Sequence, residues 1–428
     1  MITVIKGGRV IDPYNKRDEI CDVVVNGEKI ETIVPHWEAK ADRIIDATGK
    51  IVCPGFVDIH VHFRDPGFTQ KEDLYSGSKA AAKGGFTTVC CMPNTNPVND
   101  NSLVSYYIMK KAKEIGLCDI FPIGAITKGE KGQDFVDFYT LKDAGCVAFS
   151  DDGVPVMDAF VLQQVLVYSK PLNVPITLHE EDINLSSGGV INEGYYSTKM
   201  GLPGISNCSE SAIIARDVEV LRHTGGHIHV CHVSTKESIR IIERAKQDGL
   251  NITCEVTPHH LSLTEKETDG FSTQAKVNPP LRTEEDVESL QEAVKESIVD
   301  ALATDHAPHD EKSKKTTVLN AAFGISGLET AFAVLNTYLV EKGIVSLLEL
   351  IALMTYKPSI VYHLSRGTLS KGDFANITVI DLNEKWTVNR EEFVSKGRNT
   401  PFHNKNLKGQ IYYTMYKGEI TYERKNDF

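Results

Sequence analysis

The stretch PGFVDIHVHFRDPG, residues 54–67, decides the fold and carries the first sign of chemistry. Alternate residues of a β-strand project to one face. Asp58, His60 and His62 therefore share a face, while the apolar residues between them share the other. This alternation predicts a strand that lines a metal pocket, with both imidazoles converging on one ion. A lone HxH pair is weak evidence, so the prediction depends on the rest of the chain.

Downstream of this strand, short β-rich apolar segments alternate with stretches of helical periodicity. Eight strands connected through helices indicate βαβ units, and their number favours an α/β fold of the (β/α)8 TIM-barrel type. A doubly wound open sheet is the alternative, but no GxGxxG motif follows an early strand. The predicted strands are residues 57–63, 86–92, 120–127, 146–152, 175–181, 228–234, 252–258 and 301–307.

The two ends of the chain have a different pattern. Both contain short β-like segments, and those at the N-terminal end are joined by Gly or Asn-Gly turns. Neither end has enough strands for a stable core by itself. We therefore predict that residues 1–51 and 367–428 form one small β-sandwich domain beside a catalytic barrel of residues 52–366.

Composition limits the partners and the compartment. The net charge of −12 disfavours nucleic acids and anionic membranes as partners, and it means that local cations must capture an acidic substrate. The nine cysteines contain no CxxC pair and five sit in apolar segments, so we expect buried free thiols in the reducing cytoplasm. We find neither a secretory signal nor an apolar stretch of about 18 residues, and we predict no transmembrane helix.

Polar residues recur at the carboxyl ends of the predicted strands, where a TIM barrel carries its active site. Burying such groups is costly unless they are paired or bound to metal. Histidine and carboxylate ligands suit Zn²⁺, with Mn²⁺ or Co²⁺ as alternatives. Six ligands are too many for one tetrahedral zinc and predict two metals that share a bridging carboxylate and hydroxide. The candidates are His60, His62, Asp151 or Asp152, His179, His232 and Asp305.

Other histidines have simpler interpretations. His229 is three residues before His232 and is expected on the opposite face of its strand. His227 follows a turn and is expected at the surface. We interpret His259 and His260, after Thr257-Pro258, as residues that shape a loop.

Together these residues resemble the dihydroorotases of the amidohydrolase superfamily, a group of metal-dependent TIM barrels. The resemblance covers nearly the whole chain, and its first and last motifs are highly specific in combination. The chain looks like the bacterial type in which an aspartate bridges the metals. The motifs are DIHVHFRDPG (58–67), KGGFTTVCCMPNTNP (83–97), AFSDDG (148–153), HVCHVST (229–235), EVTPHH (255–260), VNPPLR (277–282) and ATDHAPH (303–309).

The resemblance implies how the metal ligands are shared. Ser150 stands where related hydantoinases and many dihydroorotases have a carboxylated lysine. Asp152 shares a strand face with Ser150, which favours it over Asp151 as the bridge. The missing lysine also argues against hydantoinase or dihydropyrimidinase activity. His60, His62 and Asp305 would bind one metal, His179 and His232 would bind the other, and Asp152 would bridge them.

The resemblance also implies a substrate pocket. A guanidinium such as that of Arg64 grips a carboxylate in a bidentate manner, whereas an ion pair with Asp65 or Glu72 is the structural alternative. Ala322 stands where the family more often has proline, which makes the loop geometry there less predictable. The implied substrate-binding residues are His62, Arg64, Asn94, Asn278 and His309, with backbone groups of Phe323 and Gly324.

The implied function is that of a dihydroorotase, which cyclises N-carbamoyl-L-aspartate reversibly to (S)-dihydroorotate and water in de novo pyrimidine (UMP) synthesis. A hydroxide between two Zn²⁺ ions would attack the ring carbonyl, with Asp305 as general base and then general acid. The alternatives are another cyclic-amide hydrolase, such as an allantoinase, and a non-catalytic scaffold subunit for aspartate carbamoyltransferase. Homodimerisation and association with aspartate carbamoyltransferase stay open, and residues 310–320 are predicted to form a mobile loop over the pocket.

Overall fold

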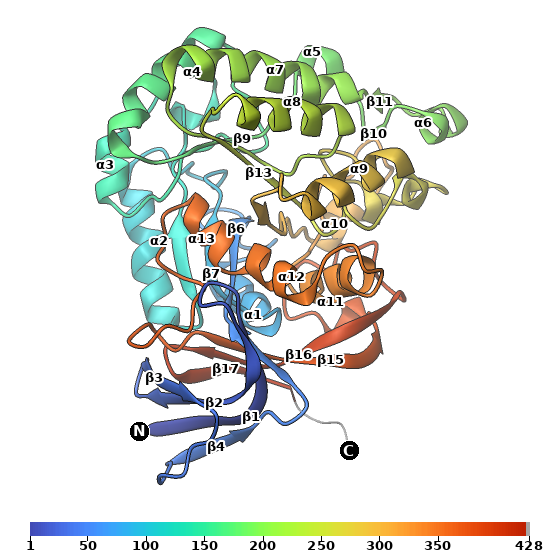
Figure 1. Ribbon diagram of the computed structural model, residues 1–428. Coiled ribbons are helices and arrows are strands. Elements are labelled where there is room, and N and C mark those ends of the chain that lie inside the picture. The colour runs from blue at the N-terminus through green and yellow to red at the C-terminus, as the bar shows by residue number, and fades with distance from the viewer. Residues whose placement is uncertain (425–428) are drawn as a thin grey trace.

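The computed structural model describes residues 1–424 and contains a ring of parallel strands (Figure 1). Three of the strands pair as one sheet, and four pair as a second sheet in the order β14-β13-β12-β9. The first sheet contains β6 (Phe56–Val61), β7 (Phe86–Cys91) and β8 (Asp119–Pro122). The second contains β9 (Ile176–Leu178), β12 (Ile228–Val230), β13 (Ile252–Val256) and β14 (Ala301–Leu302).

Isolated bridges close these two sheets into a barrel. Phe149 bridges in parallel to Gly124 on one side and to Ile176 on the other, so residues around 149 take the place of the fourth strand. At the other seam Val61 bridges to His306, whose carbonyl accepts a hydrogen bond of 2.9 Å from the His62 amide. The eight members follow chain order around the ring, which confirms the TIM barrel.

Several strands end earlier than predicted because the backbone turns where the polar side chains begin. Arg64, His232 and Asp305 have φ values of 59°, 33° and 45°, which lie in the left-handed region and end extended structure. The predicted segments 228–234 and 301–307 therefore contain strands of only three and two residues. The remaining residues form the loops that carry the site.

Helices surround the ring and bury their apolar sides against it (Figure 1). α8, for example, buries Ile239, Ile242 and Ala245, which recur at helical spacing, and its N-cap Thr235 accepts a hydrogen bond from the Ser238 amide. The larger helices are α1 (Leu74–Lys83), α2 (Ser102–Ile115), α4 (Ala159–Ser169), α7 (Asn207–Thr224), α8 (Lys236–Gln247), α9 (Glu284–Lys295) and α12 (Leu347–Met354). The shorter helices include α3 (Phe138–Asp143), α5 (Ile183–Ser186), α6 (Tyr195–Met200), α11 (Ala331–Leu335) and α13 (Tyr356–Val361).

Both chain ends contribute to one eight-stranded mixed sheet below the barrel (Figure 1). Its path runs β17-β16-β15-β5-β1-β2-β3, and β4 pairs with β1. The N-terminal and C-terminal strands meet where β15 pairs antiparallel with β5. The strands are β1 (Ile2–Asp12), β2 (Arg17–Asn26), β3 (Lys29–Val34), β4 (Arg43–Asp46), β5 (Ile51–Pro54), β15 (Ile377–Thr387), β16 (Asn406–Tyr416) and β17 (Glu419–Glu423).

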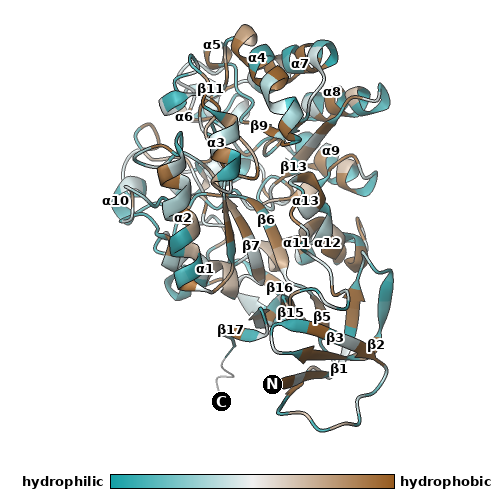
Figure 2. Cartoon of the chain, turned by 90° about the vertical axis from the view of Figure 1, so that its left-hand side faces the viewer, coloured by the Kyte–Doolittle hydropathy of each residue, from teal (hydrophilic) through white to brown (hydrophobic). Residues whose placement is uncertain are grey.

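This sheet curls until its distant strands share one apolar core. Ile30 of β3 and Met415 of β16 belong to the same buried cluster, although four strands separate β3 from β16 along the sheet. Across the opening, Lys29 bridges to Phe374, and the Ala375 amide donates to the Glu28 carbonyl at 2.7 Å. The brown strands β1, β2, β3, β5 and β15 in Figure 2 carry this core. The strands of both chain ends therefore join in one mixed sheet, as predicted, whereas the bounds of the two domains stay a prediction. Residues 425–428 lie outside the described part.

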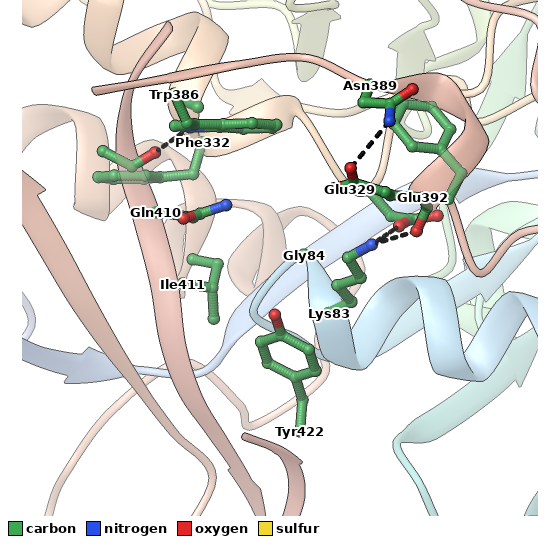
Figure 3. A pocket seen from close by; sticks show the side chains of 13 residues that line it. Lys83, Gly84, Glu329, Phe332, Trp386, Asn389, Glu392, Gln410, Ile411 and Tyr422 are labelled. Atoms are coloured by element: carbon green, nitrogen blue, oxygen red, sulfur yellow. Dashed lines mark hydrogen bonds and ion pairs between the residues drawn. The ribbon is translucent and has the colours of Figure 1, made fainter. Parts of the chain in front are cut away.

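The chain between β15 and β16 leaves this sheet and returns to the barrel. We call residues 388–405 the return segment. Its amides at Val394 and Ser395 each donate to Glu329 at 3.0 Å, and Glu329 forms an ion pair of 2.9 Å with Lys83 of α1 (Figure 3). Lys83 also donates to the Glu392 carbonyl at 2.6 Å. The return segment is thus fixed against the outside of the barrel.

Residues 310–320 contain more structure than their polar sequence indicates. They include α10 (Glu311–Lys314), and Lys314 is buried, with its Nζ donating to the carbonyls of Thr273 and Lys276 at 3.1 and 3.0 Å. The segment is therefore anchored at Lys314, and its mobility stays a prediction.

The cysteines are buried free thiols, as the sequence predicts, with one exception. All nine cysteines are free thiols, and all except Cys208 are buried. Within residues 1–424, no helix is long and apolar enough to cross a membrane.

The contact between the two edges of the curled sheet can be tested by a stability measurement at Gly418. Its φ is +80°, and a Cβ there would lie 2.0 Å from the carbonyl oxygen of Gly27, in the turn between β2 and β3. We expect Gly418→Ala to lower the free energy of unfolding by about 3 kcal/mol, because left-handed strain and a backbone clash add up. Urea unfolding measures the change.

Gly49→Ala is the matched control. Its φ of +76° is similar, but a Cβ there meets nothing within 4 Å, so only the strain of about 1 kcal/mol remains. Equal losses in the two variants would show that the contact between the turns does not hold the domain together.

Candidate metal centre and substrate pocket

Six side chains from five segments of the barrel rim meet in one buried cluster. Two triads of possible ligands have donor atoms within 4.8 Å of one another. The first is His60, His62 and Asp305, and the second is Asp152, His179 and His232. His62 Nε2 lies 3.0 Å from Asp305 Oδ1, and His179 Nδ1 lies 3.0 Å from His232 Nε2. The structure thus brings together all six residues predicted as metal ligands.

Asp152 belongs to the second triad and also faces the first. Its Oδ1 is 3.4 Å from His60 Nε2 and 3.5 Å from His232 Nε2, and its Oδ2 is 3.3 Å from His62 Nε2. Asp151 points elsewhere and accepts hydrogen bonds from the amides of Ile126 and Thr127 at 2.8 and 3.0 Å. Of the two aspartates, only Asp152 is placed to contact both triads.

The donor atoms fit a divalent cation. His60 Nε2 and Asp152 Oδ1 face each other, are buried and have no hydrogen-bond partner among the described residues. Buried polar atoms in native proteins are almost always satisfied, so this pair of unsatisfied lone-pair atoms indicates an ion. Histidine nitrogens with carboxylate oxygens suit a transition metal.

The charges around the triads also favour a cation. Burial alone would lower the pKa of His60, but Asp152 and Glu255 outweigh burial and raise it well above its usual value. Burial alone would raise the pKa of Asp152, yet His60 and His232 hold it well below its usual range. The carboxylates therefore stay ionised and draw positive charge to the centre.

A second layer of hydrogen bonds orients the imidazoles. His60 Nδ1 lies 2.6 Å from Glu255 Oε1, His179 Nε2 lies 3.1 Å from Glu181 Oε2, and His62 Nδ1 lies 2.9 Å from the side-chain oxygen of Asn94. We assign these ring nitrogens as donors, because each partner oxygen accepts. The opposite nitrogen of each ring then keeps its lone pair for the centre.

Glu181 and Glu255 were not identified as functional from the sequence. Their signal was nevertheless present, because strand alternation puts Glu181 on the face of His179 and puts Glu255 on the face of Thr253 and Thr257. Both carboxylates remain charged despite burial, because the histidines beside them lower each pKa to about 2.

His229 corrects one prediction. Its side chain is not on the opposite face from the centre but lies inside the barrel, with Nε2 3.1 Å from Glu255 Oε2. The strand ends at Val230, and the left-handed backbone at His232 breaks the alternation on which the prediction rested. His227 also departs from its prediction. It is half-buried and bonds to Thr253, so it is not a free surface group.

The pair His259 and His260 lies close to the centre without joining either triad. His260 bonds to Thr257 Oγ1 and to the Pro279 carbonyl at 2.8 and 3.0 Å, and it shapes the loop as expected. His259 is buried, and its Nε2 has no hydrogen-bond partner among residues 1–424. Burial lowers the pKa of His259 well below its usual value, so the ring is neutral.

Arg64 is a partly buried cation beside the centre. Within the described chain no carboxylate lies within 4.0 Å of its guanidinium nitrogens, and its buried Nε has no hydrogen-bond partner. Both structural alternatives are occupied elsewhere, since Asp65 pairs with Lys111 at 2.6 Å and Glu72 bonds to Ser76 and Ser395. Burial lowers the pKa of Arg64 to about 10, which leaves it charged and available for an anion.

The two predicted amides contact residues of the candidate centre. Asn94 Nδ2 donates to the Asp152 carbonyl at 3.1 Å, and Asn278 Nδ2 donates to Glu181 Oε2 at 2.8 Å. Both side chains therefore brace the centre from its rim. Their direct contact with a substrate stays a prediction.

His309 and the Phe323-Gly324 backbone form the far side of the pocket. His309 Nε2 donates to the Phe323 carbonyl at 2.7 Å, and its buried Nδ1 has no partner in the described structure. Burial and the charge of Arg64 lower the pKa of His309 to about 2, so this ring is neutral and Nδ1 is an acceptor. Gly324 has φ +141°, and a Cβ there would lie 2.6 Å from the Ala307 carbonyl oxygen, so only glycine fits.

Two cavities of the described structure differ in their position and chemistry. The first, of about 50 Å³, lies between α1, α11 and the C-terminal strands, and neither histidine nor cysteine lines it (Figure 3). The second, of about 400 Å³, reaches His309 and Asn399 and is bordered by Lys314, Lys396 and Arg398. Only the second touches the pocket, and its cations suit an acidic ligand.

Known proteins match both the sequence and the fold. The family model "Dihydro-orotase-like" matches residues 49–238. The dihydroorotase of Caldicellulosiruptor saccharolyticus is 46% identical over 97% of both chains, and that of Aquifex aeolicus is 49% identical over 98% of this chain and 99% of its own. The solved L-hydantoinase of Arthrobacter aurescens has a TM-score of 0.87 and 26% identity, covering 98% of this chain and 96% of its own. D-hydantoinase from Thermus sp., at 24% identity and a TM-score of 0.84 over 98% and 95%, shares the fold.

The two adjacent aspartates give a direct test of the metal centre. We expect Asp152→Asn to lower the metal content of the purified protein by at least one ion, because a bridging charge is lost. Elemental analysis of dialysed protein measures the change.

Asp151→Asn is the matched control. It should keep the parental metal content and lose only stability, since its partners are the amides of Ile126 and Thr127. The assignment of the bridge fails if Asp151→Asn sheds metal and Asp152→Asn does not.

Proposed function

The chain belongs to the dihydroorotase family, and we infer from this that its barrel is a metal-dependent cyclic amidohydrolase that interconverts N-carbamoyl-L-aspartate and (S)-dihydroorotate. The observation that carries the substrate assignment is Arg64, a partly buried guanidinium with no carboxylate partner in the described chain, beside a centre built from six metal-compatible side chains. This reaction is a step of de novo pyrimidine synthesis.

We propose that two Zn²⁺ ions occupy the centre. Four imidazoles and two carboxylates suit zinc, and the two triads divide these ligands with Asp152 between them. Bound ions of this kind supply Lewis acidity and lower the pKa of water. Glu255, Glu181 and Asn94 hold the imidazoles in the orientation that binding requires.

Asp305 is placed to move the proton. In hydrolysis, a water oxygen adds to the ring carbonyl carbon, the bond from this carbon to the ring nitrogen breaks, and the water proton moves to that nitrogen. Burial alone would raise the pKa of Asp305, but its contacts with His62 and His60 outweigh burial and lower the pKa, so Asp305 is ionised. Its carboxylate accepts the proton in the first step and donates it in the second.

Arg64 orients the substrate. Its guanidinium would bind the carboxylate of dihydroorotate in a bidentate manner, while the neutral Nδ1 of His309 accepts a hydrogen bond from a ring N–H. Fixing the ring at two edges places the reacting carbonyl against the centre, which lowers the entropic part of the barrier.

The alternatives predicted from the sequence lose support. A non-catalytic scaffold has no need for complete triads, yet all six side chains assemble. An allantoinase-like specificity leaves the buried charge of Arg64 unexplained. Relatives at 43–49% identity over nearly the whole chain are dihydroorotases.

We propose further that the enzyme is cytoplasmic and forms homodimers, and that it can associate with aspartate carbamoyltransferase. Free buried thiols suit a reducing compartment. Leu103 and Tyr106 of α2 are 77% and 53% exposed and offer apolar area to a protein partner.

The proposed activity is tested by Asp305. The purified protein should hydrolyse dihydroorotate, and Asp305→Ala should lower kcat by at least about 10³-fold, because proton transfer loses its carrier. The turnover and the metal content are measured on the same sample of each protein.

Asp300→Asn is the control, since Asp300 lies at the amino-terminal side of the same strand and pairs with Lys246 away from the centre. It should keep the parental kcat. Substantial turnover by Asp305→Ala with metal still bound would remove Asp305 from the proton-transfer role, and no turnover by the metal-loaded parent would reject the function.

Arg64 tests the substrate class. Arg64→Met should lower kcat/KM for dihydroorotate by about 10²-fold, because a charge-assisted bidentate contact is lost. Activity on dihydrouracil, which lacks the carboxylate, should change little. If the ratio of kcat/KM for dihydroorotate to kcat/KM for dihydrouracil were the same in Arg64→Met as in the parent, the assignment of Arg64 to the substrate carboxylate would be contradicted.

A further inference from the structure

Asn399 lies on the return segment, about 90 residues after the barrel loops that it touches, and is 3% exposed. Its Oδ1 accepts hydrogen bonds from the His309 amide at 2.9 Å and from Ser326 Oγ at 3.0 Å. Its Nδ2 donates to the carbonyls of Ala307 at 3.0 Å and Gly324 at 2.9 Å. A carboxamide has two acceptor sites and two N–H groups, so every hydrogen-bonding capacity of this side chain is used.

The four bonds join two loop segments of the same connection after β14. Ala307 and His309 directly follow β14, whereas Gly324 and Ser326 follow α10, and the two segments also pair where the Ala307 amide donates to the Ile325 carbonyl at 2.9 Å. Both loops supply the substrate pocket in the proposed function, the first through His309 and the second through the Phe323-Gly324 backbone. The Asn399 side chain is therefore a clamp across the far side of the pocket.

The backbone around Asn399 is held equally firmly. Its own carbonyl accepts from the Ser326 amide at 2.8 Å. Two residues earlier, a Cβ on Gly397 would lie 2.4 Å from Pro308 Cβ, so the return segment makes a close approach to the first loop. On its outer side, Glu329 and Lys83 fix the same segment to α1.

We propose that Asn399 is a positioning residue, which sets the distance between His309 and the Phe323-Gly324 backbone and so the shape of the substrate pocket. This inference rests on the proposed function for its consequence in catalysis. The clamp requires an amide, because a carboxylate would face the Ala307 and Gly324 carbonyls with an acceptor, and alanine would leave all four partners unsatisfied.

The experiment compares Asn399→Ala and Asn399→Asp with Asn389→Asp as the matched control. Asn389 lies on the same segment but bonds only within its own turn, where aspartate also accepts from the Glu391 amide. We expect both Asn399 variants to raise KM for dihydroorotate about tenfold, with kcat within about threefold of the parent and metal content unchanged. A change in KM with little change in kcat would not follow from general destabilisation of the metal centre.

Hydrogen–deuterium exchange gives a readout that needs no activity. In both Asn399 variants, peptides covering residues 307–312 and 322–328 should exchange faster, while the barrel strands and the Asn389→Asp protein keep the parental rates. If the parent turns over no dihydroorotate, the proposed function fails and exchange alone decides whether Asn399 clamps the loops.

Three results would overturn the inference. They are parental KM together with parental exchange in the Asn399 variants, equal effects in Asn389→Asp, and failure of both Asn399 variants to fold. The last result would give Asn399 a structural role in place of a positioning role.

Discussion

The ionised carboxylate of Asp152, buried among imidazoles, is the constraint on which the site depends. Removing such a charge from water costs several kcal/mol, about 5 by order of magnitude, unless its partners are close and well oriented. The partners here come from β6, from the ends of β9 and β12, and so from opposite parts of the ring. A barrel that failed to close would separate them and leave the charge uncompensated.

The barrel interior shows how that closure is secured. Asp58, on the same strand face as His60, accepts from Thr304 Oγ1 at 2.6 Å and from the Thr304 amide at 3.2 Å, immediately before Asp305. One side chain thus joins the first and last strands of the ring beneath the centre. Burial raises the pKa of Asp58 to about 7, although the Thr304 bonds oppose this shift, which shows how little solvent reaches that seam.

Local patterns predicted what depends on local chemistry. Alternation of residues in 57–63 predicted that His60 and His62 share one face. The alternation of strands with helices predicted the barrel, and the polar residues at the strand ends predicted the six side chains that meet. Alternation failed for His229, because the strand ends at Val230 and the left-handed His232 changes the count. Glu255 and Glu181 could have been found by alternation, whereas Asn399 could not. Its partners are 73 to 92 residues away, and no local pattern signals them.

The β domain has a consequence for biosynthesis of the chain. β5 pairs with β15, so this part of the sheet cannot form around residue 52 until the residues near 379 have been synthesised. On the ribosome, β1, β2 and β3 therefore emerge long before their C-terminal neighbours, with one edge of β5 unpaired. Closure of such distant strands is slow and exposes the intermediate to aggregation. The sheet can therefore close only after β15 has been synthesised, and a product truncated before β15 would carry an open sheet edge that chaperones and proteases can recognise.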